Sequence, residues 1–392
     1  MTSNRSTDPN QPLILWGTSH SLYTGKVRSY LIKKGLGFTE LMPHHPRFQA
    51  EIVARIRHFV VPVLETADGA LYQDSTVIID ELERCFPDRP MVPTTPVLRV
   101  LAHLLDAFGT QALLPAAMHY RWSYRAEQEH FLQAEFGRAV HHGPDREARL
   151  AAGAALMDYF NDFLPGLGIS PGTAAVFETA YEELLDALDV HFQHWPYLLG
   201  GHPSIADFGF MAPLYAHLAR DPVPSTLMKN RAANVYRWTE RMNLGCIDDG
   251  EFPDLAENWF PDDSIASTLE PVLRLLFADW GPQLIAEAQF TNAWMAANKE
   301  LPSGHVASRD GKRSVHATLG TVRYPWRGVT VERSCMPTGL WHFEHAACAA
   351  RELQGPARER LAALMQRVGG TEAMQIRLVR ALVHRDFVLT LD

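Results

Sequence analysis

The sequence has few cysteines and no long run of apolar or basic residues. Its four cysteines lie far apart among 392 residues with no C-x-x-C spacing, which favours a reduced cytoplasmic protein. The first dozen residues are polar with no apolar signal core, and no apolar stretch approaches the roughly 20 residues of a membrane helix. The net charge of −9 argues against nucleic acid or an anionic membrane as the main partner.

Several catalytic signatures are also missing. The chain has no G-x-x-x-x-G-K-[ST] loop, no G-x-S-x-G motif and no dinucleotide-binding fingerprint in the right context. The histidines of His141–His142 and Trp341–His345 lack the H-E-x-x-H spacing, and no third ligand accompanies them. The sequence therefore predicts no metal site.

At this length and with 46% hydrophobic residues, the chain is expected to form two or three domains. Its first 90 residues predict the order strand, helix, strand, poorly defined helix, strand, strand, helix. The segments that carry this interpretation are Leu13–Gly17, Val27–Lys34, Phe38–Leu41, Val60–Glu65, Tyr72–Ser75 and the apolar stripe of Val77, Ile78, Ile79 and Leu82.

Two features of this region indicate a ligand site at a sheet edge. Pro62 removes a ladder donor from an apolar strand, so the neighbouring backbone can pair with something else. Asp74 and Ser75 precede a helix, where side-chain oxygens lie beside free backbone N–H groups. Either residue alone could simply cap the helix. With the proline strand, they predict a corner that holds a ligand with both an ammonium and a carboxylate.

Three motifs in this order resemble the thioredoxin-like domain of cytosolic glutathione S-transferases. They are the loop Ser21–Arg28 that opens the first helix, the strand Val61–Leu64 and the pair Asp74–Ser75. The resemblance covers about residues 12–90 well and continues more loosely to about residue 245. The serine in the loop is similar to the bacterial type of the family.

The resemblance implies an α/β thioredoxin-like N-terminal domain at residues 12–90 and an all-α glutathione transferase C-terminal domain at residues 95–300. Pro87–Pro96, with four prolines, predicts the linker between them. Ser204 and Asp207 form a capping-box pattern that starts an apolar helix, so Asp207 is interpreted as a folding residue rather than a catalytic one.

Residues 246 to about 392 exceed the usual length of the family, and residues 301–392 of this C-terminal region predict an additional α+β extension. After a helical pattern at Leu269–Ala297, strands are expected around residues 315–324 and 329–331, with a turn at Pro325–Gly328. A helix at Leu340–Leu353 and further helices to the end should follow. The extension is expected to cover the active site or to form a subunit contact.

The resemblance also implies glutathione as co-substrate. A thiolate is scarce at neutral pH because the free thiol has a pKa of about 8.5, so the enzyme needs a donor that favours it. Ser21 matches the catalytic position of the family, and Tyr23 is the strongest rival. Ser19 and Thr24 are nearby hydroxyls that could substitute. A cysteine-based reductase is disfavoured because the loop holds no cysteine.

The other implied contacts lie on the strand and the third helix. The backbone of Val61 would bind the cysteinyl part by strand addition, with Pro62 in the cis form. Asp74 and Ser75 would bind the γ-glutamyl ammonium and carboxylate. Many relatives carry a lysine for the glycyl carboxylate where this chain has Val60. Possible replacements are Arg55, Arg57, His58 and His45.

The implied function is attack of glutathione on a hydrophobic electrophile in a cytoplasmic, detoxifying homodimer, paired through the third helix and the start of the helical domain. His119–Trp122 and Tyr124 would line the electrophile site between the domains, or belong to an ordinary helix core. The rival interpretation is a non-catalytic scaffold or ligand-binding protein, since a fold does not fix a function. No nucleic acid, membrane or metal is expected.

Overall fold

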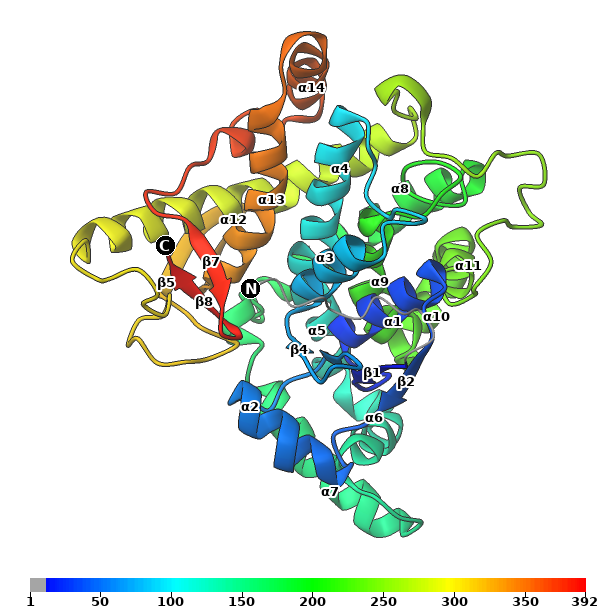
Figure 1. Ribbon diagram of the computed structural model, residues 1–392, viewed down its shortest axis with the longest axis vertical. Coiled ribbons are helices and arrows are strands. Elements are labelled where there is room, and N and C mark those ends of the chain that lie inside the picture. Colours follow the sequence, from blue (N-terminus) through cyan, green and yellow to red (C-terminus); the bar gives the residue numbers. More distant parts are fainter. Residues whose placement is uncertain (1–11) are drawn as a thin grey trace.

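The computed structural model describes residues 12–392. A four-stranded mixed sheet in the order β2-β1-β3-β4 forms the N-terminal domain, where β1 pairs parallel to β2 and antiparallel to β3. This domain is drawn in blue in Figure 1. It confirms the predicted order of elements, which are β1 (Leu13–Trp16), α1 (Leu22–Lys34), β2 (Phe38–Leu41), a π-helical turn (Phe48–Val53), α2 (Ala54–Ile56), β3 (Val63–Glu65), β4 (Leu71–Tyr72) and α3 (Ser75–Cys85).

Local sequence signals fix the two long helices of this domain. Ser21 is the N-cap of α1, and Gly35 ends it in the left-handed region at φ 75°, which favours glycine. Asp74 caps α3 by accepting a hydrogen bond from the Thr76 N–H. One face of α3 is apolar and buried, so the helix packs against the sheet.

A helical domain follows, as predicted. Its elements are α4 (Pro96–Ala107), α5 (Leu114–Trp122), α6 (Arg125–Val140), α7 (Arg146–Asn161), α8 (Ala174–His194), α9 (Ile205–Pro213), α10 (Pro222–Arg231) and α11 (Ala233–Arg241), with short π-helical turns at Phe108–Ala112 and Leu214–Ala219 and a 3₁₀ turn at Pro165–Leu167. The stretch Pro96–Trp122 is apolar and long enough to span a membrane by composition, but 72% of its most apolar window is buried inside the fold.

The helix α9 runs through the centre of the structure, and all nine of its residues are buried. The capping box is confirmed: Asp207 accepts a hydrogen bond from the Ser204 N–H at 2.9 Å. The same carboxylate accepts from the Leu198 N–H and from Trp238 Nε1. Burial raises the pKa of Asp207 to about 6. Asp207 therefore acts in the fold, as the sequence predicted.

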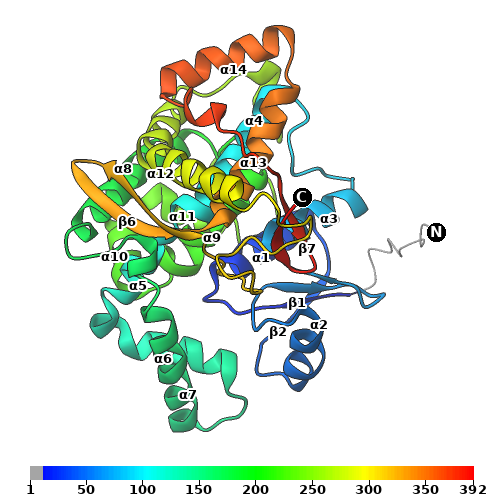
Figure 2. The ribbon, with the colours of Figure 1, turned by 90° about the vertical axis from the view of Figure 1, so that its left-hand side faces the viewer.

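The C-terminal extension wraps back onto both domains (Figure 2). After a 3₁₀ turn at Pro261–Asp263, its elements are α12 (Leu269–Ala297), β5 (Gly320–Trp326), β6 (Val329–Cys335), α13 (Pro337–Glu352), α14 (Gly355–Val368), a 3₁₀ turn at Ala373–Gln375, β7 (Leu382–Arg385) and β8 (Val388–Leu391). The helix α13 packs along α4, and β5 packs on α12. The predicted helix α12 and the hairpin β5–β6 are confirmed. The turn is shorter than predicted, because Pro325 and Trp326 pair with β6 and only Arg327 and Gly328 connect the strands. The predicted helix at Leu340–Leu353 begins earlier, with Pro337 in its first turn.

One prediction for the extension is wrong. Helices were expected to the end of the chain, but the last residues form the hairpin β7–β8. Its turn residues Asp386 and Phe387 both have positive φ, at 47° and 65°. Such turns usually carry Asn-Gly or a similar pair, so the ordinary hairpin signal was missing. In Figures 1 and 2 the red hairpin lies beside the blue N-terminal domain.

Candidate functional site

The three sequence motifs meet at one corner of the N-terminal domain. The strand β1 leads into the Ser21 loop and pairs with β3, and β3 pairs with β4, which leads into Asp74. The Val61–Pro62 peptide bond is cis, as the resemblance implies. The predicted sheet edge is wrong, because β3 begins only at Val63 and lies between β1 and β4, so Val61 and Pro62 precede an inner strand. Lys26 Nζ on α1 donates to Thr76 Oγ1 on α3 at 3.1 Å and ties the two helix starts together.

Ser21 keeps a hydroxyl proton available at this corner. Its Oγ accepts a hydrogen bond from the Thr24 N–H at 3.3 Å, which uses a lone pair and leaves the O–H to donate. The nearby hydroxyls are engaged elsewhere, since Ser19 Oγ donates to Glu135 and Thr24 is fully buried under Gly17. Ser21 also lies at the N-terminus of α1, where an anion is stabilised.

Tyr23 differs from Ser21 in its environment. Burial, followed by the nearby Asp74 carboxylate, raises the pKa of its phenol, with a smaller opposing effect of Gln111. The phenol therefore stays protonated at neutral pH. It lies between the start of α1 and the start of α3, so both of the predicted thiol-facing residues remain at the corner.

The loop before α1 is anchored to the helical domain from two sides. Arg121 Nη1 donates to the His20 carbonyl at 2.8 Å, and its guanidinium forms a buried ion pair with Asp221 at 2.6 Å. On the other side Ser19 donates to Glu135. The position of Ser21 thus depends on both domains. No local pattern indicated the role of Arg121, because its partners are distant along the chain.

The Val61 backbone and the Ser75 hydroxyl, both expected to hold a peptide, are unpaired. Among residues 12–392, no hydrogen bond is formed by the N–H or C=O of Val61. Ser75 Oγ and Gln73 Oε1 are buried and lack a hydrogen-bond partner in this described part of the chain. Asp74 has one carboxylate oxygen engaged in the helix cap. Buried polar groups normally have partners, so these atoms mark a place where a polar ligand can bind.

Beside this corner lies a buried polar network that sequence reasoning missed. Lys26 Nζ uses its three protons on Asp106 at 2.6 Å, Thr76 and Thr110. Thr76 Oγ1, which accepts from Lys26, is also hydrogen-bonded to His342 Nδ1 at 3.3 Å. Burial holds the pKa of His342 well below its ordinary value, so the ring is neutral.

His342 belongs to α13, so the extension reaches the start of α3. Its Nε2 is buried without a partner in the described part of the chain. The histidine is 266 residues from Thr76 in the sequence, and no local pattern could have connected them.

The four residues proposed to replace the family's lysine at the glycyl carboxylate have different surroundings in the structure. Arg55 donates to the Gly69 carbonyl, and His45 packs against Trp16. Arg57 forms an ion pair with Asp386 of the C-terminal hairpin. His58 Nε2 is buried with no partner among residues 12–392. Arg57 and His58 are therefore the candidates nearest to Val61 along the chain, and Arg57 is the cationic one because burial lowers the pKa of His58.

The aromatic cluster predicted for the electrophile lies in the core. His119, Tyr120, Arg121 and Trp122 are each at most 4% exposed. His119 pairs with Glu178 at 2.8 Å. The alternative interpretation of these residues, an ordinary helix core, is the one that the packing favours.

Two cavities stand out in the described part of the chain, away from the corner. One of about 40 Å³ lies between α8, α12 and β5, and one of about 470 Å³ lies beside His44, Arg138 and His142. Neither is lined by Ser21, Val61, Asp74 or Ser75. No group of three His, Cys, Asp or Glu side chains within residues 12–392 is placed to hold a metal ion.

Comparison with known proteins identifies the two domains. Residues 15–90 match the N-terminal domain of glutathione S-transferases, and residues 147–241 match the C-terminal domain of the same family. No curated protein matches the chain.

Similar solved structures carry the same family name. A glutathione S-transferase from Rhodospirillum rubrum is 16% identical, and the match covers 66% of this chain and 99% of that one with a TM-score of 0.36. One from Methylobacterium radiotolerans, in complex with glutathione sulfonate, is 18% identical over 65% and 100% of the two chains, with a TM-score of 0.34. A glutathione transferase from Phanerochaete chrysosporium is 14% identical over 61% and 99%, with a TM-score of 0.41.

The matched regions contain the features described above. The N-terminal match includes the Ser21 loop, the cis proline and the Asp74–Ser75 pair, and the C-terminal match includes the capping box of α9. The extension after residue 245 lies beyond both matches. Residues 15–90 and 147–241 are therefore the N-terminal and C-terminal domains of the glutathione S-transferase family.

Proposed function

We propose that the protein is a glutathione transferase of the bacterial type that activates the thiol of glutathione for attack on a hydrophobic electrophile. The observation that carries this proposal is the available Ser21 proton at the N-terminus of α1, beside the unpaired backbone of Val61. Each unit by which the thiol pKa falls corresponds to about 1.4 kcal/mol of preference for the thiolate. The Ser21 hydrogen bond and the α1 dipole supply that preference.

The proposed binding mode follows the unpaired groups at the corner. Glutathione pairs its cysteinyl backbone with the free N–H and C=O of Val61, just before β3. The Asp74 carboxylate attracts the γ-glutamyl ammonium, and the Ser75 hydroxyl donates to the γ-glutamyl carboxylate. Tyr23, as a protonated phenol, is the second donor that can face the thiol.

Calorimetric titration with glutathione tests the site. Asp74→Asn is the matched variant, because the amide oxygen still caps α3 while the charge that attracts the ammonium is lost. We expect the parent to bind glutathione and the variant to bind about tenfold to a hundredfold more weakly. Equal affinities for parent and variant would show that Asp74 does not bind glutathione.

Ser21→Ala tests the chemistry separately from binding. With a panel of hydrophobic electrophiles, we expect turnover to fall about a hundredfold or more while glutathione affinity stays within a factor of about three. Tyr23→Phe is the parallel variant, and the larger loss identifies the thiol donor. Unchanged turnover in both variants would exclude a hydroxyl donor from α1.

A non-catalytic scaffold or ligand-binding protein is the second candidate. Ser75 is only 1% exposed and His342 of the extension lies against Thr76, so the corner is largely covered. Glutathione binding by the parent without turnover on any electrophile would favour this candidate.

The cytoplasmic location and the homodimer belong to the same proposal. Because α13 packs along α4, a dimer through α3 and the start of α4 would use the part of this face that the extension leaves open. Sedimentation velocity tests it: a species of twice the chain mass supports the dimer.

A further inference from the structure

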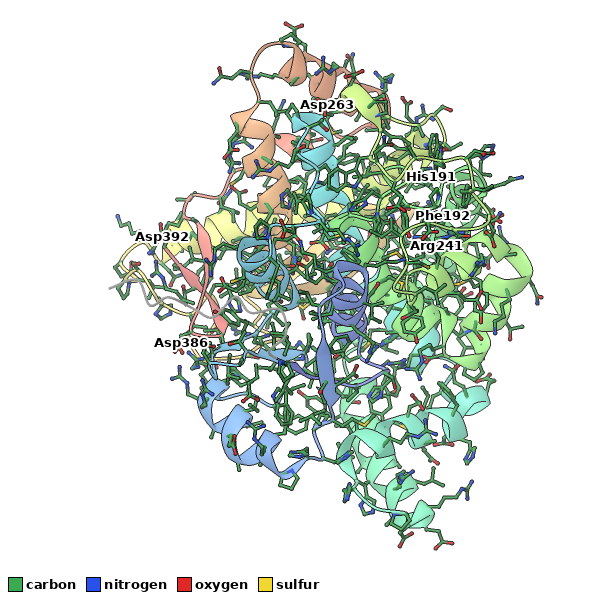
Figure 3. All side chains as sticks on the ribbon, turned by 45° about the vertical axis from the view of Figure 1, so that its right-hand side comes forward. His191, Phe192, Arg241, Asp263, Asp386 and Asp392 are labelled. Atoms are coloured by element: carbon green, nitrogen blue, oxygen red, sulfur yellow. The ribbon has the colours of Figure 1, made fainter. Side chains whose placement is uncertain are left out.

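The tip of the C-terminal hairpin places one carboxylate between two arginines. Asp386 pairs with Arg57 of the N-terminal domain and with Arg313 of the extension, whose Nη1 lies 3.0 Å from Asp386 Oδ2. Arg313 Nη2 also donates to the Asp386 backbone carbonyl. Figure 3 shows Asp386 at the end of the hairpin, next to the N-terminal domain.

This cluster has more positive charge and more donors than its carboxylate can satisfy. Two guanidiniums carry ten N–H donors by their chemistry, and one of the two positive charges remains unbalanced. Arg313 Nε is buried without a partner in the described residues, and so is the neighbouring His58 Nε2. The Arg57 hydrogen bond holds the pKa of Asp386 below its ordinary value, so this carboxylate stays ionised at neutral pH.

The cluster adjoins the proposed peptide site. Arg57 lies four residues before Val61, and Phe387, next to Asp386, packs in one cluster with Val60 and Val61. On β7, two residues before Asp386, His384 is close enough to Asp74 for the carboxylate to affect its pKa. The hairpin thus runs beside the corner from the start of α3 to Arg57.

The chemistry of glutathione requires a second anion site here. The peptide has two carboxylates, and only the γ-glutamyl one is accounted for by Ser75. The position expected to hold a lysine for the glycyl carboxylate is Val60, which has no charge. Paired guanidiniums suit a carboxylate better than a lysine does, because each presents parallel N–H donors in a planar fork.

We propose that Arg57 and Arg313 together bind the glycyl carboxylate of glutathione, and that Asp386 is the internal carboxylate that the peptide displaces. This inference rests on the proposed function of the same corner. It assigns a ligand-binding role to the extension, through a residue outside both matched family domains.

Calorimetric titration of the full chain with two peptides tests this assignment. Glutathione carries the glycyl carboxylate, whereas γ-glutamylcysteine lacks the glycine and ends in the cysteinyl carboxylate, one residue earlier in the peptide. Arg313→Gln is expected to weaken glutathione about tenfold and to leave γ-glutamylcysteine within a factor of about two. Arg57→Gln, in the other domain, should do the same.

The competing carboxylate and a neutral position supply the controls. Asp386→Asn is expected to raise the affinity for glutathione about threefold to tenfold relative to γ-glutamylcysteine, because the internal anion is removed. Arg309→Gln removes the same charge from an exposed side chain of the same segment and should change neither affinity. Retained binding of γ-glutamylcysteine shows that each variant is folded.

The outcomes separate the two proposals. If the parent binds glutathione with the expected dependence on Asp74, but Arg57→Gln and Arg313→Gln keep the ratio of the two peptide affinities, this inference is overturned and the proposed function stands. If the parent binds neither peptide, both fail. If inorganic phosphate at millimolar concentration competes equally with both peptides, the anion that it displaces is not the glycyl carboxylate, which also overturns the assignment.

Discussion

The two hairpins of the extension are held in different ways. In β5–β6 the side chains of Val322, Tyr324 and Trp326 alternate inward, each 5% exposed, and pack over α12 and α8. The tip of β7–β8 instead carries Asp386, whose side chain is 59% exposed and is fixed by two arginines. A hairpin held by apolar packing stabilises the fold, whereas one held at its tip by charge can exchange partners with a charged ligand.

The largest expected effect is a loss of stability when the apolar packing of β5–β6 is removed. Trp326 packs against Phe177 with ring centroids 4.6 Å apart and donates to Asp279. Trp326→Ala should lower the free energy of unfolding by about 3–5 kcal/mol in urea titration, with glutathione affinity unchanged. The exposed Arg323→Ala on the same strand should cost less than about 0.5 kcal/mol. A loss of glutathione binding in folded Trp326→Ala would contradict the division of roles.

An intermediate effect is an opposite response of the two hairpins to pH. Burial raises the pKa of Glu287, under β6, to about 7 from 4.5, so its contribution to stability is full at low pH and lost as pH rises. Burial lowers the pKa of His384 on β7, against the opposing effect of Asp74, so docking of β7–β8 is favoured at high pH and lost as pH falls below 6.5. When the pH is lowered from about 7.5 to about 5, the free energy of unfolding of the β5–β6 region should rise by up to about 2–3 kcal/mol.

Hydrogen exchange, corrected for intrinsic rates, measures this contrast in residues 320–335 and 382–391. Glu287→Gln should flatten the first response and His384→Gln the second. If the exchange rates of both hairpins change in the same direction with pH, the predicted contrast is wrong.

The smallest expected effect is a response to salt. The pair of Arg57 and Asp386 is half exposed on both sides, so added ions screen it. Raising NaCl from about 0.05 M to about 0.5 M should destabilise the docked tip of β7–β8 by less than about 1 kcal/mol. Faster exchange at residues 385–388 with no change in β5–β6 is the expected result, and equal changes in both hairpins would argue against it.

Much of the fold could be predicted because its signals are local. Ser21 and Gly35 bracket α1, Ser204 and Asp207 start α9, and the alternation around Val322 and Tyr324 marks a buried strand. Each signal lies within a few residues of the element it specifies. The hairpin β7–β8 was missed because its turn uses Asp386 and Phe387 in place of glycine.

The candidate site was only partly predictable for a related reason. Ser21, Val61 and Asp74 belong to motifs with fixed spacing, so the sequence named them and the structure brings them to one corner. His342 and Asp386 reach that corner from 266 and 329 residues away along the chain. Their role depends on how the extension packs, and no spacing encodes it.

The sequence by itself determined the thioredoxin-like domain, the helical domain and the motif residues of the corner, because periodicity, capping and the proline position act over short distances. Only the tertiary structure decided that Arg121 anchors the Ser21 loop, that α13 places His342 on the start of α3, and that Asp386 lies between two arginines. These contacts arise from the burial of the extension against both domains, a long-range event that local residue patterns do not specify.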